Sequence, residues 1–298
     1  MSRLVLTCVV VLGVAPLSGQ GSSAALVSVT ELAGLLKDPN VVVLHIADRG
    51  TVFEEGHIPG ARLVRYADFA VSGSDDLGSE LPPATTVKQV FESAGVSDDS
   101  RVIVYAQSPV TAARAFFTLD VFGHRRIALL DGGLRAWRDA KQPIETGAGS
   151  SARHGRFTPH LDAGRLADAG FIQQQVPGKT IALVDVRPDD EFFGDNTMGG
   201  AHAAGHIAGA RQLTWNSLVG ADGRFLPQEE LRARLQAAGV ADGRPVVAYC
   251  MVGMRASVVY FVARHLGHDA RLYDGSIVDW SRRKLPVVRG QRPVASGQ

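Results

Sequence analysis

The stretch that decides the fold is Pro245–Phe261, PVVAYCMVGMRASVVYF, which predicts a short buried strand, a compact turn and an amphipathic helix. Cys250 stands where the strand ends, Gly253 lets the turn close, and the helix is expected to begin near Ala256. The N–H groups of such a turn and the positive end of a helix favour negative charge. A free cysteine has a pKa of about 8.5, which helix N-termini and cations such as Arg255 lower, so the setting favours a thiolate. The alternative is a buried cysteine without chemistry.

Three further motifs accompany this loop. The strand LVDVR, Leu183–Arg187, precedes the turn GHIAGA, Gly205–Ala210, and the segment YDGS, Tyr273–Ser276, is followed by Trp280. Together with the Cys-x-x-Gly-x-Arg loop they resemble, in the same order, the motifs of the rhodanese-type sulfurtransferases, whose closing element is Asp-Gly-Gly-x-x-x-Trp. The resemblance implies transfer of sulfane sulfur through a cysteine persulfide, with no cofactor.

Length and composition set the broad class. The chain has 298 residues, enough for two domains of ordinary size that each bury a core. Its 31 basic and 30 acidic residues give a formal charge of +1, so charge offers no reason to expect nucleic acid or an anionic membrane as a partner. With 45% hydrophobic residues the chain is not of the disordered type, and we expect a monomer.

The amino terminus predicts an exported protein. A short basic region, Met1–Arg3, precedes the apolar run Leu4–Leu17, which is too short to span a bilayer and is followed by small residues. We therefore expect a signal peptide over residues 1–24, cleaved between Gly21 and Ala25, and a periplasmic or secreted product; the alternatives are an uncleaved anchor or a misplaced start. Cleavage removes Cys8, so no internal disulfide is possible and Cys250 is a free thiol.

The same order of elements occurs twice, which indicates a duplication with a period of about 145 residues. In the first half we expect a short helix capped by Thr30, strands at 41–46, 101–105 and 127–130, a turn at 56–61, a helix at 111–121 and a closing segment at 131–137. The halves match through GHIPGA and GHIAGA, through the strands 102–105 and 246–249, through 131–137 and 274–280, and in kind through 43–49 and 183–187.

Strands that alternate with helices predict an α/β fold in each half, a parallel sheet with helices on both faces. We expect domains at 25–143 and 158–290, joined by an exposed linker at 144–157. The first domain lacks a nucleophile, because Ala106 falls where Cys250 stands. Pro109 replaces Gly253 and Thr111 replaces Arg255, so we expect this domain to be inactive, as the family resemblance also implies.

Cys250 is the predicted nucleophile, which attacks the outer sulfur of a donor and holds it as a persulfide. The substrate-binding groups are expected to be the loop N–H groups and the guanidinium of Arg255, whose planar fork can hold two anionic oxygens. The alternative for Arg255 is a solvated side chain early in a helix. The loop residues concerned are Met251, Val252, Gly253, Met254 and Ala256.

Less evidence in the sequence supports a role in the site for Arg187, Asp185 and His206. The resemblance implies that Arg187 binds substrate, whereas the alternative is a salt bridge; Asp185 is expected to support a neighbouring loop. His206 could act as a base, but His57 has the same neighbours in the inactive half, which favours a structural role. The scattered histidines and single mature cysteine provide no metal-ligand spacing.

Three functional alternatives remain open. A cysteine phosphatase or arsenate reductase resembles this loop but uses Cys-x5-Arg, whereas four residues separate Cys250 from Arg255. A sulfur carrier or sensor would bind sulfur without turnover. Within the family, the loop departs from both the Cys-Arg-Lys-Gly pattern associated with thiosulfate and the Cys-Gly-Ser-Gly pattern associated with 3-mercaptopyruvate. The late arginine favours thiosulfate or a polysulfide as donor, with 3-mercaptopyruvate as the alternative and cyanide or a thiol as acceptor.

Overall fold

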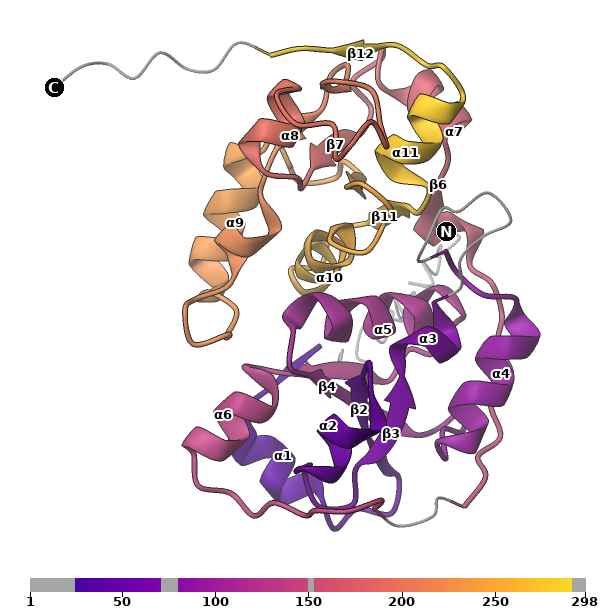
Figure 1. Cartoon of the computed structure of the whole chain (residues 1–298), viewed down its shortest axis with the longest axis vertical. Helices are drawn as coiled ribbons and strands as arrows, with labels where there is room; N and C mark the ends of the chain where they lie inside the picture. Colours follow the sequence, from indigo (N-terminus) through magenta and orange to yellow (C-terminus); the bar gives the residue numbers. More distant parts are fainter. Residues whose placement is uncertain (1–24, 71–79, 150–152, 291–298) are drawn as a thin grey trace, which may run out of the picture.

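The computed structural model describes residues 25–70, 80–149 and 153–290, so the predicted signal peptide lies outside the described residues. They form two domains of similar construction, the first below and the second above in Figure 1. The first contains β1 (Leu26–Val27), α1 (Val29–Leu35), β2 (Val41–Ala47), α2 (Gly50–Glu54), β3 (Arg62–Arg65), α3 (Tyr66–Phe69), α4 (Ala84–Ser93), β4 (Arg101–Ala106), α5 (Pro109–Val121), β5 (Ile127–Leu130) and α6 (Gly133–Asp139). The second contains η1 (Ala163–Arg165), β6 (Leu166–Ala167), α7 (Ala169–Gln175), β7 (Ala182–Asp185), α8 (Asp189–Phe193), β8 (His206–Ile207), β9 (Arg211–Gln212), η2 (Trp215–Leu218), α9 (Gln228–Ala237), β10 (Val246–Tyr249), α10 (Ala256–His265), β11 (Ala270–Tyr273), α11 (Ser276–Arg282) and β12 (Val287–Val288).

Each domain is built on a five-stranded parallel sheet. The strand orders are β1-β5-β4-β2-β3 and β6-β11-β10-β7-β9, and β8 pairs with β12 in a small antiparallel ribbon. In the central strand β4, Val102 and Val104 pack on the face covered by α5, while Ile103 and Tyr105 pack on the face covered by α6. Helices thus cover both faces, which confirms the predicted α/β fold. None of the helices in the described part of the chain is long and apolar enough to cross a membrane.

The predicted duplication is visible in equivalent contacts. Tyr105, next to the last residue of β4, and Tyr249, the last residue of β10, lie in the central strands of their sheets. Each tyrosine hydroxyl accepts a hydrogen bond from the isoleucine N–H of its own Gly-His-Ile turn, at 3.0 Å from Ile58 and 3.1 Å from Ile207. The two halves therefore repeat the same buried contact between the central strand and the turn.

Two helix starts differ from the prediction. Thr30 was the expected cap of α1, but the cap is Ser28, whose hydroxyl accepts the N–H of Glu31 while the Glu31 carboxylate accepts the N–H of Ser28. This reciprocal pair satisfies two helix-end donors at once, which Thr30 inside the helix cannot do. α5 begins at Pro109 instead of Thr111, because proline suits the first helical position and Ser108 caps it.

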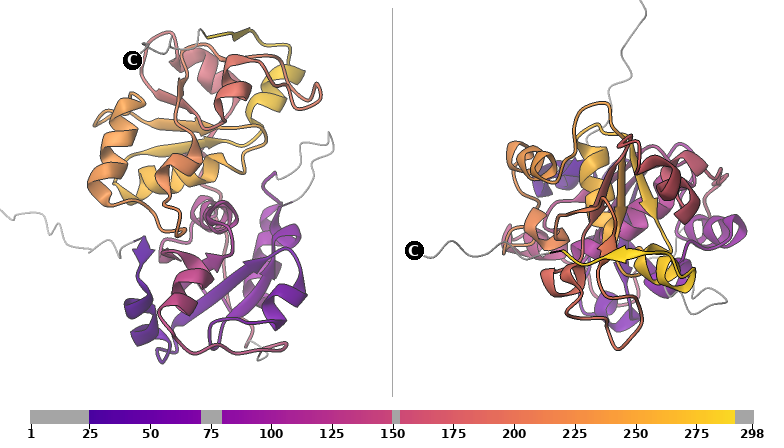
Figure 2. Two further views of the ribbon diagram at one scale, coloured as in Figure 1. Left: turned by 60° about the vertical axis from the view of Figure 1, so that its left-hand side comes forward. Right: turned by 90° about the horizontal axis from the view of Figure 1, so that it is seen from above.

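The two domains share one continuous core through α5 and α10, which lie side by side between the sheets (Figures 1 and 2). Phe116 packs edge-on against Phe261 with ring centroids 5.0 Å apart. A polar contact at the same interface joins the Tyr260 hydroxyl to Asp120 at 2.6 Å, and Arg264 binds the same carboxylate at 3.2 Å. The first domain is therefore packed in a fixed position against the second.

The connection between the domains stays close to the first one. Glu145 forms a backbone bridge with His57, and Phe157, which we placed at the end of an exposed linker, is 1% exposed. The Phe157 N–H donates to the Glu92 carboxylate at 2.9 Å. The connecting segment is thus anchored at both ends.

A fully buried histidine occupies the core of the first domain. His45 lies in β2, stacks on Tyr105 at 4.5 Å and lies 5.6 Å from Phe53. Neither of its ring nitrogens has a hydrogen-bond partner among the described residues. Burial, together with the charges of His57 and Arg138, lowers the pKa of His45 to about 4.

Acid should therefore destabilise the protein through His45. The unfolded histidine binds a proton near pH 6.5 and the folded one only near pH 4, so between these values the unfolded chain binds more protons and stability falls as pH falls. His45→Leu should show a smaller drop in unfolding temperature between pH 6.5 and pH 4 than the native protein. His160→Leu, at an exposed histidine, serves as the control. An unchanged pH dependence in His45→Leu would contradict this assignment.

Candidate active site

Cys250 lies directly after β10, at the carboxyl edge of the second sheet, and is 1% exposed. The loop of residues 251–255 leads into α10, which begins at Ala256 as predicted. Gly253 has a φ of 80°, and a Cβ there would lie 2.5 Å from an oxygen of Asp274. Only glycine fits this turn, because another residue would meet both backbone strain and a clash.

A buried hydroxyl holds the loop from behind. The N–H groups of Cys250 and Gly253 donate to Ser276 Oγ at 3.1 and 3.0 Å, and this hydroxyl donates to the Tyr273 carbonyl at 2.8 Å. Ser276 adopts a left-handed φ of 52°, where the first domain has Gly133 at 56°. The sequence identified the YDGS segment, but nothing in it indicated that the serine binds the loop.

The other N–H groups of the loop form the candidate anion cradle. They donate to no protein group among the described residues, and they follow the nucleophile directly. Unpaired N–H groups of a loop that opens a helix attract negative charge. Gly253, which we also predicted to bind substrate, instead uses its N–H for Ser276. The residues with free N–H groups are Met251, Val252, Met254, Arg255 and Ala256.

Arg255 is near Cys250, as expected, but both of its terminal nitrogens are engaged. They donate to the two carboxylate oxygens of Glu191 at 2.8 and 2.9 Å. Burial would lower the pKa of Arg255, but the bonds to Glu191 and the charge of Cys250 raise it above its ordinary value. Arg255 is 25% exposed and Glu191 only 4%. Glu191 was missed because 64 residues separate it from Arg255.

Arg187 lies in a buried ion pair and not in an open cleft. Its guanidinium donates to both oxygens of Asp185 and, at 2.8 Å, to the Gly205 carbonyl. Asp185 also accepts the Arg187 N–H at 3.0 Å, in keeping with its predicted supporting role. Burial lowers the pKa of Arg187, but Asp185 outweighs this and raises it. A substrate could reach Arg187 only after a rearrangement, because the side chain has no exposed surface. Substrate binding by Arg187 stays a prediction.

His206 braces its turn in the same way as His57 does. His206 Nδ1 lies 3.0 Å from the Phe192 carbonyl and its ring stacks on Phe192 at 3.7 Å. His57 Nδ1 lies 2.9 Å from the Phe53 carbonyl and stacks on that ring at 3.7 Å. Burial lowers the pKa of His206. The same geometry in a domain without a nucleophile favours a structural role. Among the described residues no group of three or more metal-ligating side chains is found.

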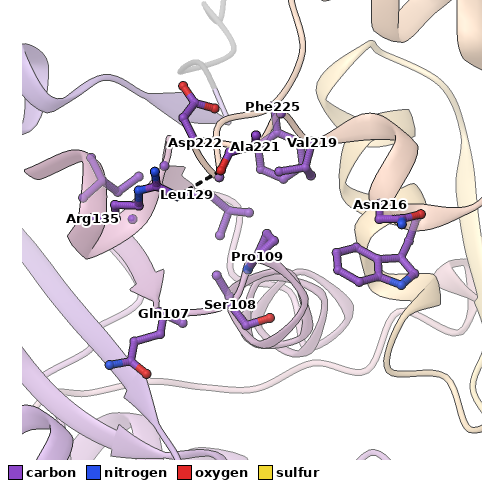
Figure 3. A pocket seen from close by; sticks show the side chains of 18 residues that line it. Gln107, Ser108, Pro109, Leu129, Arg135, Asn216, Val219, Ala221, Asp222 and Phe225 are labelled. Atoms are coloured by element: carbon purple, nitrogen blue, oxygen red, sulfur yellow. Dashed lines mark hydrogen bonds between the residues drawn. The ribbon is translucent and has the colours of Figure 1, made fainter. Parts of the chain in front are cut away.

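The equivalent place in the first domain is a cavity without a nucleophile. α5 begins three residues after Ala106, whereas α10 begins six residues after Cys250, so the first loop is shorter. The cavity of about 280 Å³ lies between Ser108 and Pro109 on one side and Trp215 and Phe225 of the second domain on the other (Figure 3). The Ser108 hydroxyl accepts a hydrogen bond from the Val110 N–H. Because Pro109 has no N–H and the Val110 N–H is taken, this shorter loop offers fewer unpaired N–H groups, within the described part of the chain, than the loop after Cys250.

The family model of the rhodanese-like domain matches residues 28–140 and 169–283. The chain belongs to the rhodanese-like family. Both of its domains are rhodanese-like domains, and only the second one has the cysteine.

Three relatives match nearly the whole chain. A Pseudomonas aeruginosa protein named a probable 3-mercaptopyruvate sulfurtransferase is 35% identical, over 93% of this chain and 99% of its own length. The sulfur carrier protein TtuD of Thermus thermophilus is 32% identical over 92% of this chain and 99% of its own. SseB of Mycobacterium tuberculosis, named for thiosulfate sulfurtransferase activity, is 31% identical over 91% and 99%.

A solved structure has the same two-domain fold. SseA from Escherichia coli, described as a 3-mercaptopyruvate sulfotransferase with the rhodanese fold, superposes with a TM-score of 0.76 at 26% identity, over 85% of this chain and 99% of SseA. The agreement confirms the predicted tandem rhodanese-like architecture. This chain is a transferase of the rhodanese type.

Loss of the Ser276 hydroxyl should loosen the loop. In both Ser276→Ala and Ser276→Gly the buried N–H groups of Cys250 and Gly253 lose their acceptor, which costs about 1–3 kcal/mol each. Only the glycine variant relieves the left-handed strain, so it should unfold at the higher temperature of the two. Sulfur transfer should fall in both. Native transfer rates in both variants would show that the hydroxyl does not position the loop.

Proposed function

We propose that this rhodanese-type sulfurtransferase moves sulfane sulfur from thiosulfate, or a related donor, to a thiophilic acceptor such as cyanide or a thiol through a persulfide on Cys250. The observation that carries the proposal is the position of Cys250, which directly precedes a loop of five unpaired N–H groups. The nucleophilic sulfur can react with the outer sulfur of an anionic donor, and the adjacent N–H groups can bind the anionic oxygens of the same donor.

The reaction is two displacements at sulfur. The Cys250 thiolate attacks the outer sulfur of thiosulfate; the new S–S bond forms as the old one breaks, and sulfite leaves with the electron pair. The acceptor thiolate or cyanide then attacks the outer sulfur of the persulfide, and Cys250 leaves as the thiolate. No net proton or electron is required when cyanide is the acceptor, since thiocyanate leaves and the starting thiolate returns.

The loop supplies the electrostatic stabilisation. Preorganised N–H groups cost no reorganisation when negative charge moves between the attacking and leaving sulfurs. The buried carboxylate of Glu191 offsets the charge of Arg255. The pair therefore adds less positive charge to the site than an unpaired arginine would. We infer that a dianionic donor must compete with Glu191 for the fork of Arg255.

A second candidate donor is 3-mercaptopyruvate. Its support comes from the Pseudomonas aeruginosa relative and SseA, whose names assign them that donor. TtuD, named as a sulfur carrier, supports the alternative that the persulfide is passed to a protein partner without free turnover. Steady-state formation of thiocyanate from thiosulfate and cyanide would separate an enzyme from a carrier.

Export and a monomeric state are further parts of the proposal. Export is supported by the basic and apolar segments within residues 1–24, which lie outside the described residues. Amino-terminal sequencing of protein from the native host tests it, since an intact Met1 on a cytoplasmic protein would refute export. A measured solution mass of twice the chain would refute the monomer.

Cys250→Ser should abolish sulfur transfer while leaving the fold intact, because an oxygen cannot form the persulfide and the two side chains are nearly isosteric. Intact mass should show one added sulfur atom on the native protein after incubation with thiosulfate, and none on the variant. The matched control is Ala106→Ser, at the equivalent position of the first domain, which should keep native activity. More than a trace of turnover in Cys250→Ser would refute the assignment.

Arg255→Lys should discriminate between donors. A lysine keeps the charge but cannot form paired hydrogen bonds, so the specificity constant for thiosulfate should fall by about ten- to a hundred-fold. The loss with 3-mercaptopyruvate should be smaller, because that donor has one carboxylate. Both donors are measured with both proteins in steady state.

Glu191→Gln is the matched variant, since it removes the competing charge and keeps the fork. It should lower the KM for thiosulfate. Equal losses on both donors in Arg255→Lys would mean that Arg255 only supports the loop. A better rate with 3-mercaptopyruvate in the native enzyme would overturn the preference for thiosulfate.

A further inference from the structure

The turn behind the active-site loop is held by the inactive domain. Arg114, in α5, donates to Asp274 Oδ1 at 2.6 Å, and the Leu81 N–H donates to Asp274 Oδ2 at 2.9 Å. Asp274 belongs to the YDGS segment of the second domain, 160 residues from Arg114. Both oxygens of this carboxylate are thus bound by groups of the first domain.

Asp274 is in direct contact with the loop. Its Oδ1 would lie 2.5 Å from a Cβ at Gly253, so the carboxylate packs against the loop backbone at the tightest point of the turn. Two residues further on, Ser276 binds the N–H groups of Cys250 and Gly253. A displacement of Asp274 would therefore be transmitted to the loop both by packing and through Ser276.

Arg114 is also a buried cation that interacts electrostatically with Cys250. Its side chain has no exposed surface, and its guanidinium lies 5.1 Å from the ring centroid of Phe117. Burial would lower the pKa of Arg114, but Asp274, Tyr66 and Cys250 outweigh it and raise the pKa. The guanidinium therefore stays charged within electrostatic reach of the Cys250 sulfur.

At the inactive loop the cation is more weakly bound and more exposed: Arg224 of the second domain lies 3.9 Å from Asp131, and its side chain is 39% exposed. Asp131, the equivalent of Asp274, accepts the Phe225 N–H of the other domain at 2.9 Å, just as Asp274 accepts the Leu81 N–H. The sixth residue of α5, however, is the buried Arg114, whereas the sixth residue of α10 is the buried Phe261. The hydrogen bond from a backbone N–H of the other domain therefore occurs at both aspartates. The buried arginine occurs only at Asp274, next to the loop that contains Cys250.

We propose that Arg114 is a positioning residue of the active site, contributed by the first domain, which acts through Asp274 on the loop that holds Cys250. The proposal rests on the proposed function of Cys250. It assigns the first domain a part in catalysis, beyond covering the second. The competing explanation is that the pair of Arg114 and Asp274 only joins the domains.

Arg114→Met tests the two explanations against Tyr260→Phe. The second variant removes another buried hydrogen bond between the two domains, from the Tyr260 hydroxyl to Asp120 at 2.6 Å, but lies outside the active-site turn. Unfolding temperature, kcat and KM with thiosulfate and cyanide, and the rate of Cys250 alkylation as a function of pH are measured for each protein.

If Arg114 positions the loop, Arg114→Met should lower kcat by about ten- to a hundred-fold with little change in KM, since a buried charge-assisted bond is lost. Its alkylation profile should move to higher pH, because a cation near the sulfur is gone. Arg114→Lys should recover most of the rate. Tyr260→Phe should lose stability and keep native kcat and the native alkylation profile.

A double variant separates a loss of activity from a loss of folding. Arg114→Met alone leaves Asp274 as a buried charge with reduced compensation, whereas Arg114→Met with Asp274→Asn removes both charges and keeps an acceptor for Leu81. The double variant should unfold near the native temperature and remain slow. Native kcat in the double variant, or equal kinetics in Arg114→Met and Tyr260→Phe, would overturn the proposal.

Failure of the proposed function gives a different result. In that case the native protein would gain no sulfur on Cys250 from thiosulfate. If only the present inference fails, native protein and Arg114→Met gain sulfur on Cys250 at the same rate.

Discussion

The active-site loop depends on one buried hydroxyl. Ser276 takes two N–H groups that would otherwise be buried without partners, at a cost of about 1–3 kcal/mol each. Its left-handed backbone costs about 1–2 kcal/mol, which the two bonds outweigh. By binding the amides on either side of Met251 and Val252, the hydroxyl sets the shape of the loop. The loop N–H groups that remain unpaired can then bind an anion.

The duplicated fold explains why one half can lose chemistry and keep its structure. The contacts that hold each sheet to its turn, such as those of Tyr105 and Tyr249, occur in both domains. The register of the strands places His45 where Asp185 stands, and Ala47 where Arg187 stands. At these two positions the first domain therefore has a neutral pair where the second has a buried ion pair, so no compensating charge is needed there.

Sequence patterns predicted what local chemistry determines. The buried strands, the matched Gly-His-Ile turns and the start of α10 after Cys250 all follow from short-range rules on hydrophobic pattern and helix ends. The cap of α1 was misplaced by two residues because both Ser28 and Thr30 are suitable cap types, and only the Glu31 side chain decides between them.

The partners of the site could not be predicted in this way. Glu191 and Ser276 reach the loop from 64 and 26 residues away, and Arg114 reaches Asp274 from the other domain. Such contacts depend on how distant segments pack within the second domain and between the two domains, which no single-sequence pattern specifies. Their consequence is electrostatic. The partly exposed Arg255 is paired with Glu191, and the fully buried Arg114 is paired with Asp274. With both cations compensated by carboxylates, the unpaired N–H groups of the loop remain the donors directed at an anion, and Arg255 can contribute only in competition with Glu191.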